Sequence, residues 1–303
     1  MTMIPIFPQF RPIQLEDRDF IHDILTKYQP ETSEWTFTNL FIWRSHYGYH
    51  WSMHGDWLLV LSIETSKGVY ALAPIGPPSR RGVTLTLLEW LREEKGAVPA
   101  RIERADQRLV AEIEGTTAFL IEPDRDQFDY IYRSTDLITL AGRKYHGKRN
   151  HINKFRRTYP FSYASFEDKY MKPCLELAER WCVLHRCEDD LNLAGEWDAV
   201  HEILTNFHAL KIRGGVILIE NQVKAFALGE PLNDQTATVH IEKADPDIPE
   251  LYAMINQQYC EKTWRDMAFI NREQDLGESG LRKAKLSYYP DHLVEKYRIQ
   301  LKG

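Results

Sequence analysis

Five charged residues of both signs occur close together near the end of the sequence. The stretch NREQDLGESGLRKAK contains Arg272, Glu273, Asp275, Arg282 and Lys285. Transfer of an acyl group to a hydroxyl or an amine needs positive charge or hydrogen-bond donors beside the developing oxyanion, and a group that accepts the proton of the nucleophile. Arg282 and Lys285 are suited to the first role, and Glu273 or Asp275 to the second.

Other roles for these residues stay open. Glu273 and Asp275 can instead orient a substrate ammonium group, or simply pair with Arg282. The apolar run at 267–270 predicts a strand that ends at this stretch, so the charges are presented at the end of a sheet strand. A solvated loop followed by a surface helix is the alternative. Just downstream, the side chains expected to line a pocket or to pack are Tyr288 and Tyr289.

A second candidate segment is strongly basic. Between Arg143 and Arg157 there are seven Lys or Arg residues and two His residues, with no acidic residue among them. Cationic residues interspersed with aromatic ones suit phosphates and stacked bases. The alternative is an exposed basic helix between domains. The candidate substrate-binding residues of this segment are Tyr145, His146, Lys148, Arg149, Asn150 and His151.

Length and composition limit the possible classes of protein. A chain of 303 residues is long enough for two domains. The net charge of −6 is not that of a general nucleic-acid binder, although a locally basic face can still attract an anionic partner. No apolar segment approaches the roughly 18 residues of a membrane-spanning helix, and the N-terminus lacks the pattern of a signal peptide. We therefore expect a cytoplasmic protein without a transmembrane segment.

The cysteines do not indicate a metal site. The sequence WCVLHRC contains Cys182, His185 and Cys187, whose spacing fits no standard zinc pattern. Cys182 and His185 fall on one stripe of a helix with Cys174, which favours core packing. We expect no metal.

Hydrophobic spacing predicts the same order of elements in each half of the chain. Two helices, a β-hairpin, a helix and a strand follow one another, and the second half has an extra strand after its hairpin. The sequence IERADQ after the first hairpin resembles INREQD after the second, which indicates a diverged internal duplication. The expected helices are 15–28, 35–43, 83–95, 172–184, 196–210 and 248–264, and the expected strands are 57–63, 69–73, 101–104, 216–219, 223–228, 237–242 and 267–270.

This order is similar to that of the GNAT acyltransferase fold. We therefore expect an α+β protein with mixed sheets and two GNAT-like domains in tandem, at 1–130 and 131–303. The second domain is expected to hold the active cleft, because only it ends in the charged elements, and the first to be degenerate. Acyl-coenzyme A users of this fold bind the pyrophosphate with a glycine-containing loop at a helix N-terminus. Here acids and prolines occupy that loop, at 242–249, which disfavours coenzyme A.

Two longer stretches resemble a known family. YIYRSTDLITLAGRKYHGKRNHINKF and NREQDLGESGLRKAKLSYYPDHLVEKY are similar to the DUF2156 family. That family is related to the C-terminal domain of phosphatidylglycerol lysyltransferases, which move an amino acid from aminoacyl-tRNA to a lipid hydroxyl. The pattern Gly-Leu-Arg-x-x-Lys-x-x-aromatic-x-Pro falls on Gly280, Leu281, Arg282, Lys285, Tyr288 and Pro290.

The resemblance implies an aminoacyltransferase whose donor is aminoacyl-tRNA, without a separate cofactor. Lys285 and Arg282 would bind the terminal phosphates of the tRNA or stabilise the oxyanion, and Glu273 and Asp275 would recognise the ammonium group. Arg272 joins the substrate-binding residues, and the basic segment would hold tRNA. The acceptor is a lipid reached from the cytosol, a peptide or a small molecule, and anionic lipid at a membrane surface is a possible partner. The alternatives are an N-acetyltransferase that uses acetyl-coenzyme A, and a non-catalytic module that binds RNA or anionic lipid.

Overall fold

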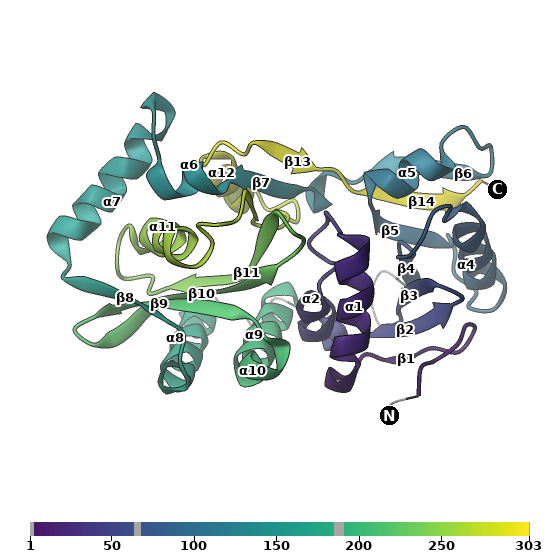
Figure 1. Ribbon diagram of the computed structural model, residues 1–303, viewed down its shortest axis with the longest axis horizontal. Coiled ribbons are helices and arrows are strands. Elements are labelled where there is room, and N and C mark those ends of the chain that lie inside the picture. Colours follow the sequence, from purple (N-terminus) through teal and green to yellow (C-terminus); the bar gives the residue numbers. More distant parts are fainter. Residues whose placement is uncertain (1–2, 64–67, 185–190, 303) are drawn as a thin grey trace. The chain divides into compact units, whose positions relative to one another are not determined.

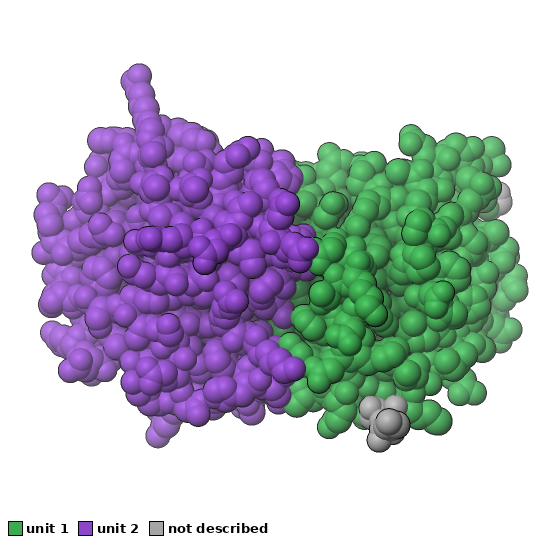
Figure 2. Space-filling model, viewed as in Figure 1, with its two compact units in different colours: residues 1–129, 274–279, 293–303 green, residues 130–273, 280–292 purple. Residues whose placement is uncertain are grey.

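The computed structural model describes residues 3–63, 68–184 and 191–302. His185 and Cys187, which the sequence analysis considered as metal ligands, lie outside the described residues. The chain divides into two compact units, shown in green and purple in Figure 2. Unit 1 comprises residues 1–129, 274–279 and 293–303, and unit 2 comprises residues 130–273 and 280–292.

The core of unit 1 is built around a mixed seven-stranded sheet. The strands β4 and β5 are parallel, and the other neighbours are antiparallel. In order across the sheet, the strands are β1 (Arg11–Pro12), β2 (Tyr49–His54), β3 (Trp57–Ser62), β4 (Tyr70–Leu72), β5 (Arg101–Ala105), β14 (Tyr297–Leu301) and β6 (Phe119–Pro123).

Two helices of unit 1, α2 and α5, start at residues whose side chains cap them. The Thr36 hydroxyl accepts a hydrogen bond from the backbone N–H of Asn39, and the Asp106 carboxylate accepts one from that of Leu109, so α2 and α5 begin at these residues. The helices and 3-10 turns are η1 (Leu15–Asp17), α1 (Arg18–Tyr28), α2 (Phe37–Ile42), α3 (Arg44–Tyr47), α4 (Arg81–Glu93), α5 (Gln107–Ile113) and η2 (Arg125–Gln127).

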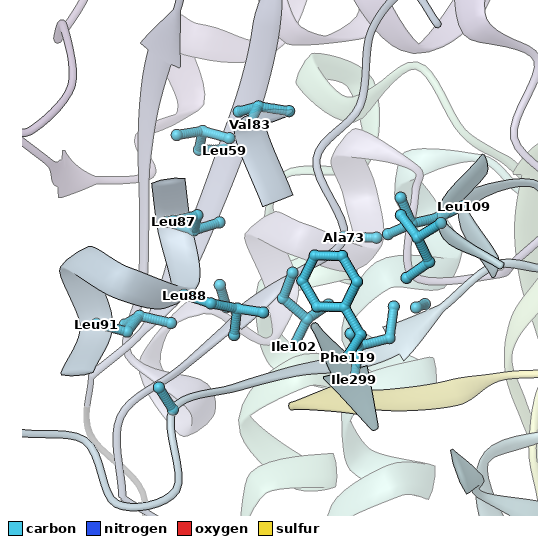
Figure 3. Packing of buried hydrophobic residues seen from close by; sticks show 14 of the residues in the cluster. Leu59, Ala73, Val83, Leu87, Leu88, Leu91, Ile102, Leu109, Phe119 and Ile299 are labelled. Atoms are coloured by element: carbon cyan, nitrogen blue, oxygen red, sulfur yellow. The ribbon is translucent and has the colours of Figure 1, made fainter. Parts of the chain in front are cut away.

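One apolar face of α4 packs on this sheet. Three of its four leucines are almost fully buried, and each of these contributes roughly 2 kcal/mol by leaving water. The contacts come from elements far apart in the chain, including the C-terminal strand. Figure 3 shows Leu87, Leu88 and Leu91 of α4 with Ile102 of β5, Leu109 of α5 and Ile299 of β14.

Unit 2 is built on a second mixed seven-stranded sheet. The strands β11 and β12 are parallel, whereas β12 and β7, and the neighbours from β11 to β8, are antiparallel. In order across the sheet, the strands are β13 (His292–Val294), β7 (Asp129–Arg133), β12 (Phe269–Asn271), β11 (Thr236–Ala244), β10 (Gln222–Pro231), β9 (Arg213–Ile219) and β8 (Phe161–Ser165).

Helices cover both faces of the unit 2 sheet. Figure 1 shows α11 on one face and α8 and α9 on the other, with α7 beside α11. The helices and 3-10 turns are α6 (Ser134–Thr139), η3 (Arg143–Tyr145), α7 (His146–Thr158), η4 (Asp168–Tyr170), α8 (Met171–Leu184), α9 (Leu191–Thr205), α10 (Phe207–Leu210), α11 (Leu251–Thr263) and α12 (Ser279–Leu286). No helix among the described residues is long and apolar enough to cross a membrane.

The C-terminal strand joins the sheet of unit 1. The strand β14 lies between β5 and β6 there, whereas β7, from the middle of the chain, lies next to β12 in the sheet of unit 2. The chain first passes between units at 129/130, close to the expected boundary, and 274–279 and 293–303 belong to unit 1.

The unit 2 sheet opens at one end, between β11 and β12. These strands pair at only three positions, ending at Thr238 and Asn271, although β11 continues to Ala244. On its other side β11 contains a bulge, because Gly229 of β10 pairs with Val239 and the preceding residue of β10 pairs with Ile241. Bulges redirect side chains and often lie beside active sites. The bulged residue, which lies between Val239 and Ile241, is His240.

Candidate active site

The chain turns sharply just beyond β12, at Arg272 and Glu273. Successive side chains of a regular strand point to opposite faces of the sheet. Glu273 has a φ of 57°, in the left-handed region, which interrupts that alternation. As a result both side chains contact β11, Arg272 at Glu242 and Glu273 at His240.

Arg272 is held by a carboxylate and two aromatic rings. Its Nη2 donates to Glu242 Oε1 at 3.1 Å, and its guanidinium carbon lies 5.2 Å from the ring centre of Tyr288 and 6.0 Å from that of Tyr132. Burial disfavours the charged guanidinium, but the charges of Glu242, Tyr132, Tyr288 and Cys260 together more than offset this and raise the pKa of Arg272. Asn256 Nδ2 donates to Glu242 Oε2 at 3.2 Å, so the carboxylate is fixed from both sides.

Lys148 of α7 belongs to the same cluster. Its Nζ lies 3.9 Å from the ring centre of Tyr288. Burial and the nearby charge of Arg272 lower the pKa of Lys148, while Glu242 and Glu250 act against them. Arg272, Lys148 and Glu242 together carry a net positive charge, which suits an anionic group of a ligand.

His240 lies between two carboxylates. Its Nδ1 is 2.8 Å from Glu273 Oε1, its Nε2 is 3.0 Å from Glu230 Oε1, and its side chain is only 1% exposed. Burial acts to lower the pKa of His240, but hydrogen bonds and charge from Glu230 and Glu273 raise it to about 9. Both nitrogens therefore donate, and the ring is an imidazolium at neutral pH.

Lys285 of α12 anchors the turn through the backbone. The residue is buried, and its Nζ donates to the carbonyl oxygens of Arg272 and of Glu273, the latter at 3.2 Å. The Tyr132 hydroxyl in turn donates to the Lys285 carbonyl at 2.8 Å. Arg282, three residues earlier on the same helix, is half-buried. Lys285 thus fixes the backbone that carries Arg272 and Glu273.

Asp275 is fully buried and belongs to unit 1. Its Oδ1 accepts a hydrogen bond from the backbone N–H of Gly277 at 2.9 Å, and Arg125 Nη1 lies 3.3 Å from its Oδ2. These contacts stabilise the turn that follows Gln274.

The residues of the basic segment have different environments. Tyr145 is fully buried, and its hydroxyl donates to the Tyr288 carbonyl at 2.9 Å. Its ring meets the half-exposed ring of Tyr289 edge to face, with ring centres 5.5 Å apart. Arg149 donates to the carbonyls of Leu140 and Gly142, where α6 ends. Tyr145 and Arg149 therefore hold α6 and α7 in place.

The remaining residues of this segment lie on the exposed side of α7. His146 and Asn150 contact each other at 3.1 Å. His151 Nδ1 lies 2.5 Å from Glu250 Oε2, and Lys154 Nζ lies 3.5 Å from Glu250 Oε1. Ile152 and Phe155 are the buried residues of the helix, which leaves most of its cations facing solvent.

Carboxylates occupy the connection from β11 to α11. Asp245 is buried and paired with Arg180 at 3.0 Å and with Lys224 at 3.5 Å. Glu250 is the N-cap residue of α11. The helix N-terminus that would receive a pyrophosphate in an acyl-coenzyme A enzyme of this fold thus carries negative charge.

Sequence reasoning found Arg272 and Glu273 because charged residues directly follow an apolar strand, but it did not select His240 or Glu230. Both occur within long strands, and neither spacing nor motif marks them. Only the pairing of β10 with β11 brings Glu230 and His240 together.

Comparison with known proteins identifies the relatives of this chain. Residues 25–300 match the family model described as "Phosphatidylglycerol lysyltransferase, C-terminal". A crystal structure of a conserved protein of unknown function from Bacteroides thetaiotaomicron is 36% identical, with a TM-score of 0.90 over 99% of this chain and 100% of that one.

Two more distant structures are similar in fold. The C-terminal domain (DUF2156) of a putative lysylphosphatidylglycerol synthetase from Agrobacterium fabrum is 15% identical, with a TM-score of 0.64 over 95% of this chain and 92% of that one. L-PGS from Bacillus licheniformis is 14% identical, with a TM-score of 0.63 over 99% of this chain and 94% of that one. The expected α+β architecture of two GNAT-like domains in tandem is confirmed.

Proposed function

Because the chain belongs to the family of the phosphatidylglycerol lysyltransferase C-terminal domain, we propose that it transfers an amino acid from aminoacyl-tRNA to an acceptor hydroxyl or amine. The observation that carries the proposal is the net positive cluster of Arg272, Lys148 and Glu242 at the open end of the unit 2 sheet, which continues into the basic helix α7.

The donor tRNA is bound through its phosphates. Lys148 lies on the side of α7 that contacts Tyr288, and further cations of the basic segment lie on its exposed side. Phosphate contacts of this kind position a nucleic acid without reading its sequence. The exposed cations are Arg143, Lys144, Lys154, Arg156 and Arg157.

The transfer itself exchanges one ester for another ester or an amide. The acceptor oxygen or nitrogen forms a bond to the acyl carbon of the donor, and the bond from that carbon to the ribose oxygen breaks. The proton that the acceptor loses ends on the departing ribose hydroxyl. Arg272 and Lys148 are placed to stabilise the negative charge that develops between these two events.

Coenzyme A is not the donor in this proposal. Its pyrophosphate would have to bind at the start of α11, where Asp245 is buried and Glu250 is the N-cap residue. The cations nearby are already paired with these two carboxylates, Arg180 and Lys224 with Asp245 and Lys154 with Glu250, so a pyrophosphate would have to compete for them.

The first experiment measures release of labelled amino acid from a mixed pool of aminoacyl-tRNAs, with and without vesicles that contain phosphatidylglycerol. We expect release by the wild-type protein and at least tenfold less by Lys148→Ala, because a charge-assisted contact contributes about 1.5–3 kcal/mol. Lys169→Ala, which removes an exposed lysine elsewhere in unit 2, is the matched control. Release that depends on the vesicles identifies a lipid acceptor, and the absence of release under both conditions contradicts the proposal.

The salt dependence of tRNA binding tests the role of α7. Changing Arg143, Arg156 and Arg157 together to Gln removes three exposed cations. We expect the slope of log affinity against log salt to become shallower by about 0.7 to 0.9 for each phosphate that the variant no longer neutralises. The control changes Lys169 and Lys172 to Gln, and an equal effect of both variants would contradict a site on α7.

A further inference from the structure

The sequence leaves two roles open for Glu273, recognition of an ammonium group or acceptance of a proton. We propose that Glu273 recognises the α-ammonium group of the donor amino acid, and that His240 is the positioning residue that keeps Glu273 oriented for it. The inference rests on the proposed function, and it explains how the candidate active site selects its donor.

The first argument is the chemistry of the contact. His240 has a carboxylate at each ring nitrogen, at 2.8 Å and 3.0 Å, so it donates from both and carries a positive charge. A carboxylate has two oxygens and about four acceptor positions, so Glu273 can accept hydrogen bonds from His240 and from a ligand ammonium group at the same time.

The second argument is accessibility. The side chain of Glu230 is 5% exposed, that of His240 is 1% exposed, and that of Glu273 is 17% exposed. Of the three, Glu273 is the one that a ligand reaches first. Glu230 holds the far nitrogen of the ring, so the imidazolium cannot turn away from Glu273.

The third argument is the rigidity of the surrounding backbone. His240 is the bulged residue of β11, and Gly229 of β10 is packed so closely that an added Cβ would lie 2.1 Å from the Thr238 carbonyl oxygen. On the other side, the carbonyl of Glu273 accepts hydrogen bonds from Lys285 Nζ and from the backbone N–H of Tyr130. Both partners of the contact are thus fixed by backbone interactions.

The fourth argument is the pattern of charge. Glu230, His240 and Glu273 sum to −1, whereas Glu242, Arg272 and Lys148 sum to +1. The two groups are adjacent, because Arg272 and Glu273 are consecutive and their partners are two residues apart on β11. An aminoacyl ester of tRNA has an ammonium group on one side of its carbonyl and phosphates on the other, which matches this arrangement.

The test compares two donors that differ only in the α-ammonium group. One is aminoacyl-tRNA, and the other is the same tRNA acylated with the corresponding α-hydroxy acid, which has a hydroxyl in place of the ammonium. We expect the wild-type protein to prefer the aminoacyl donor about 10- to 100-fold in kcat/KM, as for a charge-assisted hydrogen bond. Glu273→Gln is expected to abolish this preference, with the loss appearing in KM for the aminoacyl donor.

His240→Gln tests the positioning role. It retains a hydrogen-bond donor but no positive charge, so we expect an intermediate loss of preference, and no further loss when it is combined with Glu273→Gln. Glu176→Gln, which changes an exposed carboxylate of unit 2, is the matched control. A fall in kcat that is equal for both donors in Glu273→Gln would show that Glu273 acts as a base, and would overturn the inference.

Binding and NMR measurements separate failure of the inference from failure of the proposed function. We expect 3′-aminoacylamino-3′-deoxyadenosine to bind the wild-type protein more tightly than its deaminated analogue, and Glu273→Gln to lose this difference. Nitrogen NMR is expected to show His240 protonated at both nitrogens at pH 7. If no tRNA donor reacts but these two results hold, the ammonium site stands and the proposed transfer is wrong. If transfer occurs but His240 is neutral, the inference is wrong.

Discussion

Arg272 donates to the Glu242 carboxylate at 3.1 Å. The two residues follow the last position at which β12 and β11 pair. The last backbone pair between the strands joins Thr238 and Asn271. Beyond it, an ion pair between side chains replaces backbone hydrogen bonds and fixes the spacing of the separated segments. The opening is therefore held by the same residues that we assign to the ligand.

Breaking this ion pair is expected to destabilise the protein. Arg272→Met leaves the Glu242 carboxylate, 12% exposed, without its guanidinium partner. We expect the free energy of unfolding to fall by about 3 kcal/mol, the lower end of the range for a buried pair because both side chains are partly exposed. Urea unfolding measures the change. The double variant Arg272→Met/Glu242→Leu is expected to recover part of the loss, and equal destabilisation of both variants would contradict this account.

Lys285 provides a separate test of how the turn is held. Lys285→Met removes the ammonium group that binds the carbonyls of Arg272 and Glu273, so both side chains lose their fixed position. We expect at least a tenfold loss of transfer, since displacement of a catalytic group by about 1 Å can cost 100-fold. Lys283→Met, at an exposed position of the same helix, is expected to retain the wild-type rate.

Hydrogen exchange distinguishes anchoring by Lys285 from direct contact with the substrate. The backbone N–H of Tyr130 donates to the Glu273 carbonyl at 3.2 Å. If Lys285 anchors the turn, this amide exchanges faster in Lys285→Met without any substrate present. Unchanged exchange together with abolished transfer would assign Lys285 to the substrate instead.

Much of the fold follows from local patterns in the sequence, but the position of the C-terminal strand β14 does not. The spacing of apolar residues in α4 and the hairpin of β9 and β10 are local signals, and the sequence predicts both. The strand β14 has no such signal, because Ile299 becomes buried only when the C-terminal segment enters the sheet of unit 1, about 200 residues away from β5. No local pattern therefore indicates that residues 293–303 belong to unit 1.

The site was predictable only in part, for a similar reason. Charge directly after an apolar strand identified Arg272 and Glu273. The basic pattern did not distinguish Lys148, which faces Arg272, from Arg149, whose guanidinium binds the carbonyls at the end of α6. Sequence gives the charge of a side chain, whereas its partner depends on the direction in which the helix presents it.

The bulge at His240 requires glycine at position 229. An added Cβ would lie 2.1 Å from the Thr238 carbonyl oxygen, which cannot move without disrupting the sheet. We expect Gly229→Ala to lower the free energy of unfolding by about 2 kcal/mol or more, as for overpacking of a core. In the control, Gly147→Ala, nothing lies within 4 Å of the new Cβ on α7, and a gain of about 0.5–1 kcal/mol is expected. Urea unfolding of both variants tests the claim, which requires the free energy of unfolding to fall in Gly229→Ala and to rise in Gly147→Ala.

Protonation of His240 links the stability of the protein to pH. Its pKa is about 9 in the folded protein and about 6.5 in the unfolded chain. A raised pKa means that the folded state binds the proton more tightly, so the contribution is fully present below pH 6.5 and is lost as the pH rises through 9. A shift of about 2.5 units corresponds to roughly 3 kcal/mol at most.

His240→Gln isolates this contribution because it cannot titrate. We expect the wild-type protein to lose stability to urea between pH 6.5 and pH 9, and His240→Gln to lose at least about 2 kcal/mol less over the same interval. Burial also raises the pKa values of Cys174 and Cys260, but these thiols contribute equally in both proteins and cancel in the comparison. Parallel pH profiles for the two proteins would mean that His240 is neutral in the fold, and that Glu230 and Glu273 are held by something other than an imidazolium.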